Sequence, residues 1–102
     1  MYTLDDLLEL VCAEKAQALE LRTGAPPVLV VANERHTIEG PPITPGNAEL
    51  LLHAVANSRR RRELREKGRL EFIHTFCRSA TFQVRITLTG ENMAIDFQRQ
   101  SR

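Results

Sequence analysis

The chain has 102 residues, 42% of them hydrophobic and 26% charged, which is the size and composition of one globular domain with a single core. Its formal net charge of +1 excludes a strong overall field that would attract nucleic acid or a membrane. No apolar run approaches the roughly 18 residues of a membrane span, and the acidic start does not resemble a signal peptide. We therefore expect a soluble, cytoplasmic protein whose two cysteines, Cys12 and Cys77, are reduced.

An amphipathic helix is predicted at the start of the chain. Apolar residues at spacings of three and four form one stripe: Leu4, Leu7, Leu8, Val11 and Cys12. Thr3 and Asp6 have the spacing of a capping box, and the acidic residues of this stretch suit the positive end of a helix dipole. The pattern predicts a helix over 3–15 in which Cys12 is a packing residue.

A stiff proline pair separates two apolar segments, 19–21 and 28–31. Pro26 and Pro27 fix φ and lack an N–H, so the stretch excludes a helix and favours a turn, and Gly24 admits a backbone angle that a side chain would resist. The β-branched run 28–31 is typical of a strand with both faces covered. We predict two strands joined by a structural corner at Gly24, Pro26 and Pro27.

The middle of the chain predicts a short strand and two helices. Residues 35–38 favour a strand after an Asn-Glu turn. Thr44 followed by proline is typical of an N-cap with proline at the first helical position, and an apolar stripe continues this helix to about residue 57. A second, very charged helix is predicted over 59–67, and Gly68 is the signal that ends it.

The last third of the chain shows the clearest strand signal. Apolar residues alternate with polar ones over 70–76, 81–88 and 93–98, which is the period of a strand with one buried face. Three such strands in succession predict an antiparallel meander covered on its apolar face by the helices. The element order α-β-β-β-α-α-β-β-β indicates a single α+β domain.

Several short motifs resemble one family. Residues 16–27, AQALELRTGAPP, match a segment similar to A-S-D-L-H-L-x-x-G-x-P-P at the first alanine, both leucines, the glycine and both prolines. The pair Pro41-Pro42 precedes a helix, residues 71–74 partly match a D-F-S-F-like strand, and residues 81–85 follow a strand similar to R-F-R-V-N. Over 1–102 the chain thus resembles the N-terminal domain of the type IV pilus retraction ATPases (PilT) and their type II secretion relatives. The resemblance implies a PAS-like fold, an antiparallel sheet flanked by helices.

The chain also departs from that family. It contains no G-x-x-x-x-G-K-[ST] motif, and it ends at Arg102, where the family continues into its motor domain. The family's polar positions in the matched segments hold other residues here: Ala18, Glu20, Thr81, Gln83 and Arg85. We therefore expect a non-enzymatic module without a cofactor.

The candidate partner-binding surface is the basic run on the charged helix: Arg59, Arg60, Arg61, Arg62 and Arg65. Such a run suits an anionic partner, either the acidic face of a protein or a phosphate backbone. The alternative is a solvated helix face with ion pairs between Arg59 and Glu63 and between Arg62 and Glu66. The near-zero net charge and the lack of interleaved aromatic residues favour this second interpretation and count against nucleic acid.

No metal site or catalytic constellation is expected. His36, His53 and His74 are too widely spaced for a compact ligand set. Cys77 lies three residues after His74, and residues three apart on one strand point to opposite faces, so this pair does not suit nucleophilic catalysis. His74 falls on the apolar phase of its strand, which is typical of a hydrogen-bonded core or edge histidine.

The favoured function is a protein-interaction adaptor that docks on a type IV pilus or secretion ATPase, a GTPase or a polarity regulator of bacterial twitching motility. One alternative is the N-terminal domain of a longer hexameric P-loop ATPase, and another is a PAS-like sensor of a small ligand. Exposed strand edges also allow a homodimer. Nucleic-acid binding ranks last, and no membrane contact is expected.

Overall fold

The computed structural model describes residues 1–76 and 80–100 and contains every predicted element in the predicted order. The helices and strands are α1 (Leu4–Ala13), β1 (Ala18–Arg22), β2 (Val28–Val31), β3 (Glu34–Thr37), α2 (Pro45–Val55), α3 (Ser58–Lys67), β4 (Arg69–Phe76), β5 (Ala80–Thr89) and β6 (Asn92–Arg99). The predicted α+β class is thus confirmed. Cys77 lies outside the described residues, so its predicted placement on the opposite strand face from His74 stays a prediction.

Local capping sets the helix boundaries, as the sequence predicts. Each N-cap oxygen accepts a hydrogen bond from the backbone N–H three residues later: Thr3 from Asp6 (3.2 Å), Thr44 from Asn47 (3.1 Å) and Asn57 from Arg60 (2.9 Å). Gly68 ends α3 in the left-handed conformation with φ 77°.

The six strands form one antiparallel sheet in the order β3-β2-β1-β6-β5-β4. The N-terminal hairpin strands join the C-terminal meander through β1 and β6, where Leu19 lies opposite Phe97 and Leu21 opposite Ile95. Pairing of the first strand with the last gives the protein one continuous sheet and one core.

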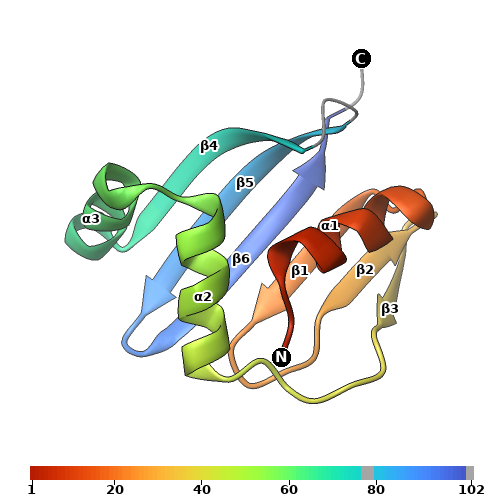
Figure 1. The fold of residues 1–102 in the computed structure, drawn as a ribbon, viewed down its shortest axis with the longest axis horizontal. Helices are drawn as coiled ribbons and strands as arrows, with labels where there is room; N and C mark the ends of the chain where they lie inside the picture. The colour runs from red at the N-terminus through yellow and green to blue at the C-terminus, as the bar shows by residue number, and fades with distance from the viewer. Residues whose placement is uncertain (77–79, 101–102) are drawn as a thin grey trace.

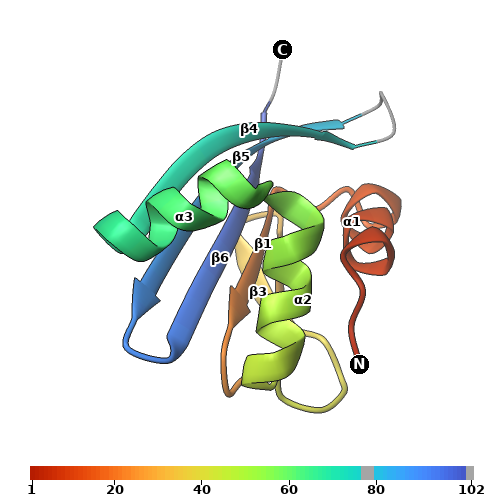
Figure 2. The same cartoon turned by 60° about the vertical axis from the view of Figure 1, so that its left-hand side comes forward.

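All three helices cover the same face of the sheet (Figures 1 and 2). The covered face is lined by the predicted apolar phase of β4, β5 and β6, and Phe82 and Phe97 lie at its centre, fully buried, with their rings edge to face and 6.0 Å apart. Within the described residues, no helix has the length and apolarity needed to cross a membrane.

The prediction that both faces of β2 are covered is wrong. Only Leu29 of this strand is buried, while Val28 and Val30 are half-exposed on the sheet face that no helix covers. Val31 lies on the helix side and packs against the core without being buried itself. The β-branched run therefore reflects strand propensity rather than burial on two sides.

Candidate functional site

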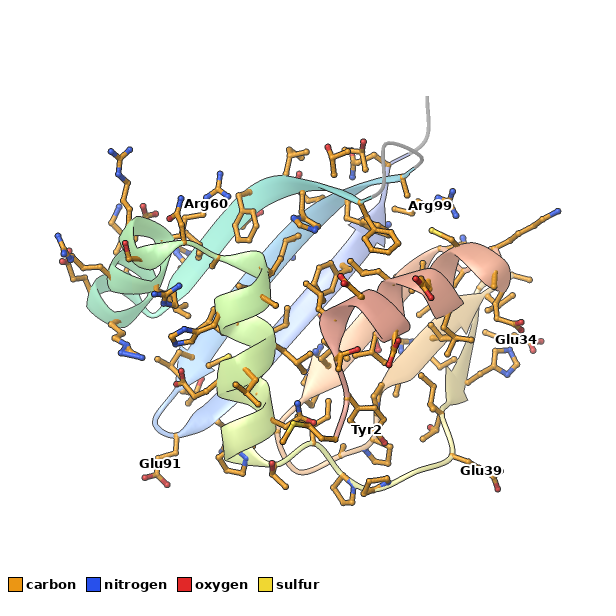
Figure 3. The ribbon with its side chains drawn as sticks, in the orientation of Figure 1. Tyr2, Glu34, Glu39, Arg60, Glu91 and Arg99 are labelled. Atoms are coloured by element: carbon orange, nitrogen blue, oxygen red, sulfur yellow. The ribbon has the colours of Figure 1, made fainter. Side chains whose placement is uncertain are left out.

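The basic run on α3 divides into inward-facing and outward-facing arginines. Arg60 (labelled in Figure 3) is half-buried, with its guanidinium carbon 4.3 Å from the centroid of the Phe72 ring. Arg61 is also half-buried, and its Nη1 donates a hydrogen bond to the carbonyl oxygen of Ala56, 2.7 Å away. These two side chains flank the fully buried Leu64 one helical turn away and attach α3 to the rest of the fold.

The remaining arginines of the run face solvent. Arg59 and Arg62 are exposed, and Arg65 lies 3.6 Å from a carboxylate oxygen of Glu49 on α2. A hollow of about 480 Å³ lies between α2 and α3, and its lining is mostly basic: His53, Ser58, Arg61, Arg62, Arg65 and Glu66. The structure thus brings Arg61, Arg62 and Arg65 together at one concave surface.

The ion pairs predicted along α3 differ from those observed. In the part of the chain that the structure describes, Arg59 does not pair with Glu63, nor Arg62 with Glu66; Glu63 instead lies 3.9 Å from Lys67. The i,i+4 pair with the acidic residue nearer the N-terminus is the more favourable arrangement on a helix. Arg59 and Arg62 therefore keep unneutralised charges.

The uncovered face of the sheet carries a second polar surface. Arg35 on β3 reaches across β2 to Glu20 on β1, and its Nε and Nη2 lie 3.0 and 3.1 Å from the two carboxylate oxygens. The hydrogen bond from Arg35 lowers the pKa of Glu20 below its ordinary value. Glu20 is thus held ionised and oriented by a neighbouring strand.

Two more ion pairs continue this surface across the sheet. Arg22 on β1 forms a two-pronged contact with Asp96 on β6, with its second pair of atoms 3.3 Å apart. Arg85 on β5 lies 3.5 Å from Glu71 on β4, and the amide of Gln83 lies 3.5 Å from the same carboxylate. Glu71 is therefore an exposed carboxylate paired within this surface.

A shallow hollow of about 150 Å³ lies on the same face. Its lining comes from β1, β5 and β6: Ala18, Glu20, Gln83, Arg85, Asp96, Phe97 and Gln98. The two sequence segments that resemble family motifs, 16–27 and 81–85, thus meet at one place through the pairing of β1 with β6 and of β6 with β5. Four of the five substituted polar positions border this hollow, namely Ala18, Glu20, Gln83 and Arg85, whereas Thr81 does not line it.

The glycine–proline corner ties the β1–β2 connection to the segment before α2. Gly24 has φ 90°, and its N–H donates to the carbonyl oxygen of Ile43 (2.8 Å), whose own N–H donates to the carbonyl oxygen of Ala25 (2.9 Å). Pro27 is buried, and its carbonyl oxygen accepts from Ile38 N–H at 2.9 Å. These contacts are those of a structural corner.

The three histidines lie on three different elements. His36 is on β3, His53 on α2 and His74 on β4, and the described residues contain no cluster of three side chains able to hold a metal ion. His74 is half-buried on the helix-covered face, where burial, and secondarily the charge of Arg60, lower its pKa. No side-chain hydrogen bond to His74 occurs among the described residues, contrary to expectation. Cys12 is half-buried and packs against the core.

Comparison with known proteins finds similarity at the level of structure only. No family model and no curated protein matches the chain. The crystal structure of the pilus retraction motor PilT with bound ADP superposes with a TM-score of 0.84 and 18% identity, covering 96% of this chain. The Legionella pneumophila ATPase DotB superposes with a TM-score of 0.80 and 16% identity, covering 95% of this chain.

The match extends over only part of either ATPase. This chain spans 29% of the PilT chain and 28% of the DotB chain. At these sequence identities, the likeness establishes the fold. The chain has the fold of the N-terminal domain of PilT-like ATPases, as the sequence resemblance implied.

Proposed function

We propose that this chain acts as a non-catalytic docking domain of a PilT-like ATPase. The observation that carries the proposal is the superposition over 96% of this chain on 29% of the PilT chain, together with a sequence that has no phosphate-binding G-x-x-x-x-G-K-[ST] loop. A domain that holds no nucleotide-binding loop serves an ATPase by contact with its motor part.

We place the docking surface on the uncovered face of the sheet, around the hollow bordered by Glu20, Gln83 and Arg85. Cross-strand ion pairs already orient charged side chains of this face, so less side-chain entropy is lost on binding. A flat, polar and pre-ordered face suits the folded surface of another domain, where charge complementarity fixes the orientation.

The test is binding of this chain to the motor domain of a PilT-like ATPase encoded in the same genome, measured by isothermal titration calorimetry. Arg85→Ala removes one cation of the uncovered face, and we expect roughly tenfold weaker binding. Arg59→Ala, on α3, is the matched control and leaves binding unchanged. If the natural chain does not bind the motor domain, the proposal is wrong. If only Arg59→Ala loses binding, the docking surface lies on α3.

A free cytoplasmic adaptor that docks on the same motor is the second candidate function. The exposed, unneutralised Arg59 and Arg62 favour it, because they offer an additional surface to an acidic partner. An immunoblot of native cells with an antibody to this domain separates the two candidates. A band near 11.6 kDa supports the adaptor, and a band several times larger supports a domain of a longer ATPase.

A PAS-like ligand sensor has less support, because the centre of the core is occupied by the fully buried rings of Phe82 and Phe97. The hollows described above are bordered by surface side chains rather than by this core. A metabolite from a screening panel that raises the melting temperature of the chain would support the ligand-sensor function.

A further inference from the structure

The two outer helices of the helix layer carry opposite charges. In α3, six basic and two acidic side chains give a net charge of +4. In α1, three acidic side chains and no basic ones give −3. Since the whole chain has a net charge of only +1, its charge is separated rather than mixed. Figures 1 and 2 show α3 and α1 on either side of α2, at opposite ends of the layer.

Part of this charge is exposed and has no opposite partner among the described residues. Asp5, Asp6 and Glu9 on α1 are exposed, as are Arg59 and Arg62 on α3, and none of the five forms an ion pair among the described residues. The uncovered sheet face differs, because its charges are paired across strands. Unpaired charge of one sign at each end of a layer favours a partner that supplies the other sign.

The basic end is also concave and partly fixed in place. The hollow between α2 and α3 has a volume of about 480 Å³, and Arg61, Arg62 and Arg65 line it. The hydrogen bond from Arg61 to the Ala56 carbonyl oxygen orients that guanidinium and leaves most of its N–H donors free. A concave surface with an excess of basic side chains concentrates a positive field on whatever enters it.

We propose that the α3 surface of one copy, formed by Arg59, Arg61, Arg62 and Arg65, docks on the acidic face of α1 of a second copy. The two helices match in length, since each has 10 residues, or about 15 Å. The acidic face of α1 that meets them comprises Asp5, Asp6 and Glu9.

The contact joins two different surfaces of the chain. Two copies can satisfy both surfaces reciprocally, α3 on α1 and α1 on α3, and a copy that makes only one of the two contacts leaves a surface to which a further copy adds head to tail. A symmetric contact of α3 with α3 would bring like charges together and is disfavoured. The inference is independent of the proposed docking on an ATPase, which uses the other face of the sheet.

The physical chemistry predicts a weak and salt-sensitive association. Exposed ion pairs contribute little individually, and the Debye length falls from about 30 Å at 0.01 M salt to about 8 Å at 0.15 M. Self-association is therefore expected at low ionic strength and at high local concentration, for example where copies are held together in a larger assembly.

Sedimentation equilibrium of the full chain in about 20 mM and about 300 mM salt tests the proposal, because these conditions change the Debye length severalfold. The natural chain is expected to self-associate at low salt and to be monomeric at high salt. Two double variants reverse one surface each: Arg59→Glu with Arg62→Glu on α3, and Asp5→Lys with Glu9→Lys on α1. Each variant alone is expected to self-associate at least roughly tenfold more weakly.

The decisive result is the equimolar mixture of the two variants, in which opposite charges again face each other and association returns. Glu34→Lys with Glu39→Lys is the matched control, because it changes the net charge as much as the α1 variant but lies elsewhere (both residues are labelled in Figure 3). This control should associate like the natural chain, and circular dichroism checks that every variant is folded.

Three results would overturn the proposal. The first is a natural chain that stays monomeric at low salt, the second is a mixture that does not regain association, and the third is a control that loses association as fully as the α1 variant. If the chain stays monomeric and α3 instead binds a DNA oligonucleotide or an acidic peptide of another protein, the basic surface serves that ligand and the self-docking proposal fails.

Discussion

The guanidinium of Arg60 lies over the ring of Phe72, with 4.3 Å between its central carbon and the ring centroid. The contact joins the third residue of α3 to the middle of β4, an edge strand of the sheet. Phe72 is buried, so the arginine stem covers apolar surface while the charge meets the face of the ring. Arg60 is therefore a structural residue, as is Arg61, within a run whose other arginines face solvent.

We expect Arg60→Ala to lower the free energy of unfolding by about 0.5–2 kcal/mol, the range of cation–π contacts from exposed to desolvated sites. Arg59→Ala is the matched control, one residue earlier and exposed, and its effect should stay within about 0.5 kcal/mol. Urea unfolding followed by circular dichroism measures both. Equal effects of the two substitutions would show that the contact with Phe72 contributes nothing.

Asn47 fixes the start of the chain to α2. It is 4% exposed, its Oδ1 accepts from the backbone N–H of Tyr2, and its Nδ2 donates to the Tyr2 carbonyl oxygen, both at 2.8 Å. Asn47→Ala leaves both backbone groups unsatisfied, so we expect a loss of about 1–3 kcal/mol in unfolding free energy.

The comparison for Asn47 is Tyr2→Phe, which removes only the exposed hydrogen bond from the Tyr2 hydroxyl to the Pro41 carbonyl oxygen. Its cost should be smaller, about 0.5–1.5 kcal/mol. Thermal unfolding of both variants in one buffer measures the difference. A Tyr2→Phe variant at least as destabilised as Asn47→Ala would contradict the role assigned to the amide.

Local signals account for most of what the sequence predicts correctly. The capping oxygens of Thr3, Thr44 and Asn57 and the left-handed Gly68 act within four residues, and the period-two pattern of the last three strands needs no knowledge of the rest of the chain. The covered face of the meander follows from that alternation alone.

Contacts between distant segments account for what the sequence does not predict. Nothing local specifies that β1 pairs with β6, and without this pairing the hollow beside Glu20 and Gln83 does not exist. Tyr2 and Asn47 are 45 residues apart, and no local sequence pattern predicts the hydrogen bond between them.

The sequence does contain a signal that separates the inward-facing arginines of α3 from the outward-facing ones. Leu64 is the sole apolar residue of α3, so the residues three and four positions before it, Arg61 and Arg60, share its buried side. Helical periodicity thus separates these two arginines from Arg59 and Arg62. Arg59 keeps an unneutralised charge because Glu63 pairs with Lys67 instead, and residue spacing alone does not decide between these two partners.

His74 makes the stability of the fold sensitive to mild acid. Its pKa is lowered, first by burial and then by the charge of Arg60 from α3, while Asp5 from α1 acts in the opposite direction. The unfolded chain takes up the proton near the ordinary value of 6.5, so it binds more protons than the folded chain below that pH. Stability contributed by neutral His74 is therefore present above pH 6.5 and is lost as the pH falls.

We expect His74→Gln to flatten the fall of unfolding free energy below pH 6.5. His53→Gln, at an exposed histidine on α2, is the control and should leave that slope as in the natural chain. Urea unfolding at a series of pH values measures the slope. An unchanged slope in His74→Gln would mean that another group takes up the proton on unfolding.

Gly24 and Gly46 offer a pair of alanine substitutions with opposite expected signs. A Cβ added at either position meets no heavy atom within 4 Å, so steric contact does not distinguish them. Gly24 has φ 90°, a conformation that alanine resists, and its N–H holds the Ile43 carbonyl oxygen at 2.8 Å. Gly46 lies in the first turn of α2 without a positive φ, where alanine restricts the unfolded chain and favours the helix.

We therefore expect Gly24→Ala to lower the free energy of unfolding by about 1 kcal/mol or more, and Gly46→Ala to raise it by about 0.4–1 kcal/mol. Differential scanning calorimetry should place the two midpoints on opposite sides of that of the natural chain. A shift of both midpoints in the same direction would mean that backbone conformation does not govern the corner. If Gly24→Ala lowers the free energy of unfolding while Ile43 stays ordered, the loss comes from the positive φ of residue 24, because no heavy atom lies within 4 Å of the added Cβ.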